Sequence, residues 1–125
     1  MAEFLLDANI LIGVFRGENE LRSFVENLDA TIDTTVYVEL IQGAKNKSEV
    51  EQIEVALSQF DVLHFDEGVS RKTIDLIRTY SKSHNLMFGD AIIAATCIQH
   101  GLELVTFNIK DFRFIKNLKI RVPKF

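Results

Sequence analysis

Six residues with oxygen-bearing side chains stand near points where a short apolar run of this sequence gives way to helical spacing. They are Asp7, Asn9, Glu39, Asp90, Asn108 and Asp111. The carboxyl ends of strands in an open α/β sheet are where ligands are handled. Carboxylate and amide oxygens suit hard cations such as Mg²⁺ and Mn²⁺. A cation held there lowers the pKa of a bound water and neutralises charge on a phosphodiester.

Each acid also has an ordinary structural explanation. Asp7 and Asp90 are of a type that caps helices, and Glu39 is an acid close to a helix start, where the helix dipole favours negative charge. However, carboxylates that converge without a basic partner repel one another, and their pKa values rise unless a cation shares the site. Acids at every such junction therefore favour metal-dependent phosphodiester hydrolysis.

The alternation of apolar runs with amphipathic stretches predicts one α/β domain spanning residues 1–125. We expect three layers, α/β/α, around a mostly parallel sheet of four to five strands. Right-handed crossovers then bring every strand-to-helix junction to one side of the sheet. The expected strands are 4–6, 31–34, 62–65, 104–106 and 120–122, and the expected helices after the first are 18–28, 36–44, 48–60, 67–84, 91–100 and 111–115.

Three local details accompany these elements. Ser48, three residues before Glu51, has the spacing of a capping box and predicts the start of the fourth helix. Gly101 predicts the end of the alanine-rich helix. Phe88, in the loop before Asp90, is expected to pack inward rather than to stack on a base.

Composition is that of an ordinary soluble domain, with 47% hydrophobic and 26% charged residues in a chain of 125. The single cysteine, Cys97, excludes an internal disulfide and suits a reducing compartment. Glu3 and Asp7 lie where a secretion signal would carry positive charge, and the apolar run 10–15 is too short to cross a bilayer. We expect a cytoplasmic protein without a membrane anchor.

Charge is unevenly distributed along the chain, although the net charge is only −4. Acidic residues outnumber basic ones within residues 1–34. Residues 110–125, in contrast, contain six bases and a single acid, Asp111. A basic segment beside an acidic site suits a nucleic-acid backbone, and the candidates for phosphate contacts are Lys110, Arg113 and Lys116. The alternative is a solvated surface strip without a ligand.

Several short motifs occur together in a specific order: Leu5-Leu6-Asp7-Ala8-Asn9, then Glu39-Leu40 with Gly43, Asp90-Ala-Ile-Ile-Ala-Ala, Gly101, Leu104-Val105-Thr106, Asn108 and Asp111-Phe112. In these motifs the chain resembles PIN-domain ribonucleases of the VapC toxin type over nearly its whole length. The resemblance implies that Asp7, Glu39 and Asp90 are the central metal-binding acids. The family's fourth position, often acidic, falls on Asn108, which carries no charge, so Asp111 is an alternative for that place.

The resemblance also implies a mechanism and partners. Asp7 and Asp90 would bind Mg²⁺ or Mn²⁺, Glu39 would position the attacking water, and Asp111 or Asn108 would complete the shell. Asn9 would orient the first aspartate, and Thr106 would support the site. Such toxins cleave RNA, often tRNA, are neutralised by a small antitoxin, and commonly form homodimers.

Two alternatives remain open from the sequence. A PIN-like domain that has lost activity would serve as a binding module, and the uncharged Asn108 is the one hint of it. A phosphoacceptor domain of the haloacid dehalogenase or receiver kind would use Asp7 as its nucleophile. That pattern requires a second aspartate where Asn9 stands and a lysine at a later strand end, which the sequence does not clearly supply.

Overall fold

The computed structural model describes residues 2–125 and is built around a parallel sheet. Its strands pair in the order β3-β2-β1-β4-β5, and every pairing is parallel. The strands are β1 (Phe4–Leu6), β2 (Ala30–Asp33), β3 (Val62–Leu63), β4 (Glu103–Val105) and β5 (Ile120–Arg121). The predicted sheet is thus confirmed, with five strands and no antiparallel member.

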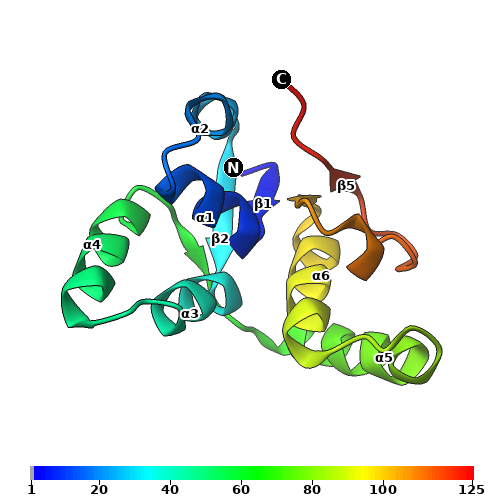
Figure 1. Cartoon of the computed structure of the whole chain (residues 1–125). Helices are drawn as coiled ribbons and strands as arrows, with labels where there is room; N and C mark the ends of the chain where they lie inside the picture. The colour runs from blue at the N-terminus through cyan, green and yellow to red at the C-terminus, as the bar shows by residue number, and fades with distance from the viewer. Residues whose placement is uncertain (1) are drawn as a thin grey trace.

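Helices cover both faces of this sheet. The connections from β1 to β2 and from β2 to β3 step in one direction, whereas the chain from β3 to β4 returns across the sheet. Right-handed crossovers therefore place the first four helices on one face and the last two on the other, as Figure 1 shows. The helices are α1 (Ala8–Phe15), α2 (Asn19–Glu26), α3 (Thr34–Gln42), α4 (Lys47–Leu57), α5 (Glu67–His84) and α6 (Phe88–His100). The three-layer α/β/α prediction is confirmed.

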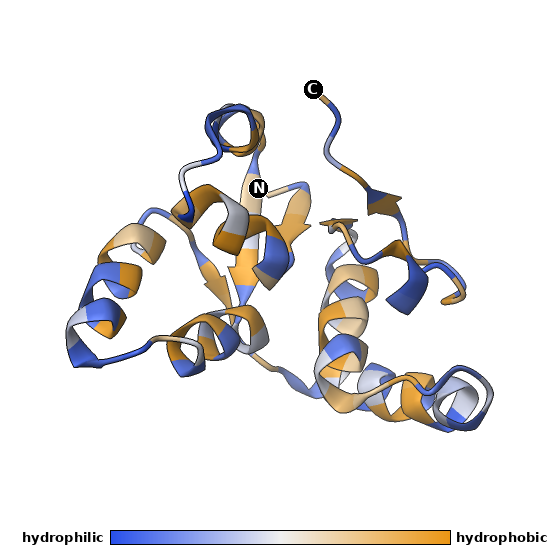
Figure 2. Ribbon diagram, in the orientation of Figure 1, coloured by the Kyte–Doolittle hydropathy of each residue, from blue (hydrophilic) through white to orange (hydrophobic). Residues whose placement is uncertain are grey.

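The core lies between the central strands and α6. Leu5, Leu6 and Leu104 are fully buried, and so are most residues of the run Ala91–Cys97 in α6. Figure 2 shows hydrophobic residues concentrated on β1, β2 and α6, while α4 has a mixed surface. Short alanine side chains let α6 approach both the sheet and α5 closely. Cys97, expected as a small buried residue, is completely buried and free.

Most helix boundaries differ from the prediction by one to three residues, as in α3, which was expected at 36–44. Asn46, not Ser48, caps α4, because its Oδ1 accepts a hydrogen bond from the Glu49 backbone N–H at 2.9 Å. Met87, not Asp90, is the cap residue of α6, so Asp90 lies inside the first helical turn. The predicted helix 111–115 is wrong: a short 3₁₀ helix, η1 (Ile109–Asp111), is followed by turns that lead to Asn117 in a left-handed conformation.

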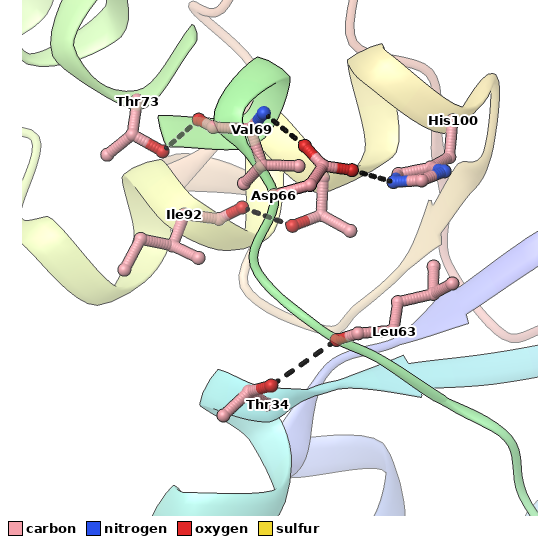
Figure 3. Close-up of polar contacts among 8 residues, drawn as sticks. Thr34, Leu63, Asp66, Val69, Thr73, Ile92 and His100 are labelled. Carbon is pink, nitrogen blue, oxygen red and sulfur yellow. Dashed lines mark hydrogen bonds and ion pairs between the residues drawn. The ribbon is translucent and has the colours of Figure 1, made fainter. Parts of the chain in front are cut away.

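The long helix α5 is tied to α6 at one end by Asp66 (Figure 3). Oδ1 of Asp66 caps α5 by accepting from the Val69 backbone N–H at 2.8 Å, and Oδ2 lies 3.5 Å from Nε2 of His100 at the end of α6. Gly68 permits this close approach, since a Cβ there would lie 2.8 Å from Nε2 of Gln99. No helix within residues 2–125 has the length and apolar character needed to span a bilayer.

Replacing Asp66 with Ala is expected to lower the free energy of unfolding by about 1 kcal/mol, because the α5 cap is lost. Urea unfolding followed by circular dichroism measures the change. The matched control is Glu67→Ala, which removes only an exposed i,i+4 pair with Arg71 and should cost at most about 0.5 kcal/mol. Equal losses in the two variants would show that the cap contributes nothing specific.

Candidate active site

Polar residues lie side by side where β1 and β4 end. Leu6 of β1 pairs with Val105 of β4, so the residues that follow, Asp7 and Thr106, are neighbours at the carboxyl edge of the sheet. The Thr106 hydroxyl donates a hydrogen bond to Oδ2 of Asp7 at 2.8 Å. The chain leaves β1 towards β2 on one side, while β4 flanks β1 on the other. The pair therefore occupies the switch point at which α/β sheets bind ligands.

A small hydrogen-bond network holds the Asp7 carboxylate in place. Its Oδ1 accepts from the Ala8 backbone N–H at 2.8 Å, and its Oδ2 also accepts from Nδ2 of Asn9 at 3.3 Å. The Thr106 oxygen in turn accepts from Nδ2 of Asn9 at 3.4 Å and from the Asn108 backbone N–H at 3.0 Å. Asn9 and Thr106, the two residues expected to support Asp7, thus both contact it directly.

Burial dominates the electrostatics of Asp7, which is only 6% exposed. Loss of hydration raises the pKa of this carboxyl above its usual value, and the negative charge of Asp111 raises it further. The hydrogen bonds from Thr106, Ala8 and Asn9 act in the opposite direction because they favour the ionised form. No base offsets the charge, since no ion pair involves Asp7 within residues 2–125.

Glu39 and Asp90 reach the same region from two other helices. Burial raises the pKa of Glu39 on α3, and the charges of Asp7 and Asp90 add to the increase. Burial raises the pKa of Asp90, in the first turn of α6, to about 6, with further contributions from Asp7 and Asp111. The charge of Asp7 thus raises the pKa of both Glu39 and Asp90, so the structure brings together three of the predicted site acids at one edge of the sheet.

Asp111 and Asn108 differ in what they offer the site. Asp111 ends η1 and is exposed, yet its charge raises the pKa of both Asp7 and Asp90. Asn108 is also exposed; its backbone N–H donates to the Thr106 hydroxyl, and its carbonyl accepts from the Asp111 N–H at 3.1 Å. Of the two alternatives left open by the sequence, Asp111 is the one whose charge acts on the site.

The site includes one acid that sequence reasoning missed. Asp33, the last residue of β2, is completely buried, and its charge raises the pKa of Glu39. The sequence indicated only a strand near this position. The rule that singled out Asp7, an acid where a short apolar strand meets a helix, applies equally to Asp33 and would have found it.

The donor chemistry fits a hard divalent cation, although the carboxylates do not form a closed cage. Among residues 2–125, no three His, Cys, Asp or Glu side chains are close enough together to enclose a metal ion. Mg²⁺ keeps several of its waters and needs only one or two direct carboxylates. A buried oxygen of Asp33, Oδ2, has no hydrogen-bond partner, which leaves an acceptor free at this edge. Asp7 and Asp90 would provide direct ligands, with Glu39 and Asp111 acting through water.

The basic segment begins inside η1 with Lys110, next to Asp111, and continues through Arg113 and Lys116. Lys110, Arg113 and Lys116 are exposed, and in the part of the chain that the structure describes none of them forms an ion pair. The backbone of this segment is anchored, since Lys116 N–H donates to the Tyr80 hydroxyl at 3.1 Å. The three bases are thus available to an external anion.

The rim beside Asp90 is apolar and open. Met87 and Phe88, at the start of α6, are 63% and 68% exposed. The expectation that Phe88 packs inward is therefore wrong. Asp90 must face the acidic edge from the first turn of α6, and the helix geometry then directs Phe88, two residues earlier, away from the core.

A groove of about 740 Å³ opens next to Glu39 among the first four helices. Its walls combine apolar side chains with three bases, Arg16, Arg22 and Lys45. The full lining is Ile12, Phe15, Arg16, Arg22, Glu39, Leu40, Gly43, Lys45, Glu49, Gln52, Ile53 and Ala56. The groove is thus suited to an amphipathic segment that carries negative charge.

This fold and this acidic edge define a known class. Residues 4–117 match the family model of the PIN domain, and the chain belongs to that family. Within the family it is similar to VapC proteins. It is 31% identical to Ribonuclease VapC10 of Mycobacterium tuberculosis, with 92% of this chain and 90% of that protein covered. It is 28% identical to Ribonuclease VapC1 of Rickettsia felis, with 93% and 92% covered.

Solved structures show the same relationship. A toxin–antitoxin complex from Klebsiella pneumoniae contains a chain with a TM-score of 0.79 and 31% identity, covering 98% of this chain and 97% of that one. A DNA-bound VapBC from Salmonella typhimurium aligns with a TM-score of 0.83 and 25% identity, with 98% of each chain covered. The resemblance to the VapC type noted from the motifs is confirmed.

Metal-free protein is expected to lose stability as the pH rises through the Asp90 titration. The folded-state pKa of Asp90 is raised from 3.8 to about 6, so the unfolded chain releases its proton first as the pH increases. The free energy of unfolding should therefore fall between these two values. Urea unfolding in EDTA at several pH values measures this slope. Asp90→Asn should flatten it, whereas the exposed-site control Asp61→Asn should not. An identical slope in all three proteins would contradict the assignment.

Proposed function

We propose that this protein is a Mg²⁺- or Mn²⁺-dependent endoribonuclease that acts as the toxin of a toxin–antitoxin pair. The observation that carries the proposal is the convergence of Asp7, Glu39 and Asp90. Their pKa values are all raised, and none of them forms an ion pair with a base within residues 2–125. Such a cluster is stable as anions only when a cation shares it. The relatives VapC10 and VapC1 are named ribonucleases, which supports RNA as the substrate.

The bound cation would lower the pKa of a water molecule and neutralise charge on the scissile phosphate. Asp7, held by Thr106 and Asn9, provides a fixed ligand that does not need to reorient. Asp90 provides a second ligand from α6. Glu39, with a raised pKa and an exposed position on α3, orients the attacking water and accepts its proton. Asp111 completes the acidic edge.

The basic segment that begins at Lys110 in η1 is proposed to bind the substrate. Lys110, Arg113 and Lys116 are exposed and unpaired among the described residues, so they contact phosphates of the RNA backbone without neutralising the acids. Phosphate contacts position a substrate but do not read its sequence. Structured RNA such as tRNA, in the cytoplasm, is the substrate class that the family resemblance suggests.

The antitoxin is proposed to occupy the groove beside Glu39. Its apolar wall would accept a hydrophobic segment, and Arg16, Arg22 and Lys45 would pair with acidic residues of that segment. An occupant of this groove would lie against Glu39 and would block the access of RNA to that residue. The similar chains in VapBC and other toxin–antitoxin complexes support such a partner. We also propose a homodimer, as the family resemblance suggests.

The two alternative functions, a phosphoacceptor domain and an inactive binding module, differ from the proposed nuclease in the role of Asp7 and in the need for a cation. Both its oxygens accept hydrogen bonds and it is only 6% exposed, which suits a fixed ligand better than the nucleophile of a phosphoacceptor domain. An inactive binding module would keep the fold without the cation. The uncharged Asn108 is the feature that favours it.

Asp7→Asn is expected to reduce RNA cleavage at least about a hundredfold and to abolish growth inhibition, because a charged ligand is lost. Cleavage is measured with purified protein, RNA and Mn²⁺, and EDTA should remove the parent's activity reversibly. The control is Glu3→Gln, an exposed acid at the other end of β1. Parent-like cleavage by Asp7→Asn refutes the mechanism, and a parent that neither cleaves RNA nor binds Mn²⁺ supports the binding module.

Arg113→Ala is expected to weaken RNA binding about three- to tenfold at moderate salt and to reduce the slope of log affinity against log salt by about one. Filter binding over a range of salt concentrations measures both. Mn²⁺ affinity should not change, because Arg113 makes no contact with the acids. Arg71→Ala on α5 is the control. Unchanged affinity and slope in Arg113→Ala would leave the basic segment as a solvated strip.

A further inference from the structure

Asp33 occupies the same position on β2 that Asp7 occupies on β1. Phe4 pairs with Ala30 and Leu5 with Thr31, so the register continued by two residues sets Asp7 opposite Asp33. Neighbouring strands lie about 4.8 Å apart, and paired residues of parallel strands point to the same face. Two aspartates therefore stand side by side at the carboxyl edge of the sheet.

The two oxygens of Asp33 have different surroundings. Oδ1 caps α3 by accepting from the Val36 backbone N–H at 2.9 Å. Oδ2 is buried and has no hydrogen-bond partner. The nearby Thr35 hydroxyl favours the ionised form of Asp33, but it does not approach with the geometry of a full hydrogen bond. Capping alone does not explain an aspartate here, since Ser, Thr or Asn would cap α3 equally well without burying a charge.

A buried carboxylate without a partner is costly unless another charge compensates it. Asp33 is 0% exposed, and among residues 2–125 it forms no ion pair. The ionised form of Asp33 is disfavoured further by its surroundings, because burial and the charge of Asp7 both raise its pKa. The charge of Asp33 in turn acts on Glu39. A cation bound where these acids meet would compensate the charge of Asp33 without protonating it.

We propose that Asp33 is a further acidic residue of the metal centre, whose unpaired Oδ2 beside Asp7 supplies negative charge that strengthens divalent-cation binding. This inference rests on the proposed metal-dependent function. Asp33 supplies a further negative charge from the β2 side of Asp7, opposite the β4 side on which Asp111 lies. It is a positioning residue: its Oδ1 fixes the start of α3, and with it the helix that carries Glu39, while its charge acts on the cation.

The test compares Mn²⁺ affinity, measured by electron paramagnetic resonance on purified metal-free protein, in the parent, Asp33→Asn and Asp29→Asn. Asparagine retains an oxygen to cap α3 and removes only the charge. We expect the dissociation constant of Asp33→Asn to rise at least about fivefold, since a unit charge near a divalent ion contributes strongly at low dielectric. Asp29→Asn removes an exposed charge just before the amino end of β2 and should shift affinity less than about twofold.

Thermal unfolding of the metal-free proteins separates charge from structure. If Asp33 acts through its charge, Asp33→Asn melts no lower than the parent without metal and gains less stability on adding Mn²⁺. If Asp33 were only a helix cap, Asp33→Asn would keep the parent's Mn²⁺ affinity and gain as much stability from Mn²⁺ as the parent, because asparagine still caps α3, and that result overturns the proposal. If the asparagine variant does not fold, Asp33→Ser replaces it, because serine also caps helices without carrying a charge. The same weaker Mn²⁺ binding is expected for it.

The outcomes distinguish this inference from the proposed function. If the parent binds Mn²⁺ and Asp7→Asn does not, while Asp33→Asn binds like the parent, the metal centre stands and the role of Asp33 is refuted. If the parent binds no Mn²⁺, both proposals fail together.

Discussion

Repulsion among carboxylates gathered at one edge of the sheet, with Asp7 buried among them, is the constraint on which the account of this site depends. Asp7, Glu39 and Asp90 each have a raised pKa, burial is the largest cause in every case, and the charge of a neighbouring acid adds to it. A folded chain ordinarily avoids this arrangement or pairs it with a base. Here the described part of the chain provides no such base, which is why the proposed function includes a divalent cation at this edge.

The fold tolerates the acids because of where their helices begin. Asp7 caps α1, Asp33 caps α3, and Asp90 lies in the first turn of α6. Each helix N-terminus carries a partial positive charge that favours a nearby anion, and backbone N–H groups satisfy one oxygen of each capping aspartate. A parallel sheet directs all these N-termini to one edge. The same geometry that stabilises the individual acids therefore concentrates their charge.

Much of this arrangement could be predicted from the sequence, because it follows from periodicity and strand ends. Asp7, Glu39 and Asp90 were found in that way. The start of α4 was not, since Asn46 and Ser48 are both good capping residues two positions apart and only tertiary packing chooses between them. Asp33 satisfies the same local rule as Asp7, an acid where a short strand meets a helix, but its position opposite Asp7 follows from the register of two strands distant in sequence, which no local pattern contains.

The most direct test of the central claim is the anomalous diffraction of a crystal grown with Mn²⁺. The account predicts a strong anomalous peak at the edge of the sheet, within coordination distance of carboxylate oxygens of Asp7 and Asp90. A map without a peak there, with both carboxylates ordered and paired instead to lysine or arginine nitrogens of the same chain, would contradict it.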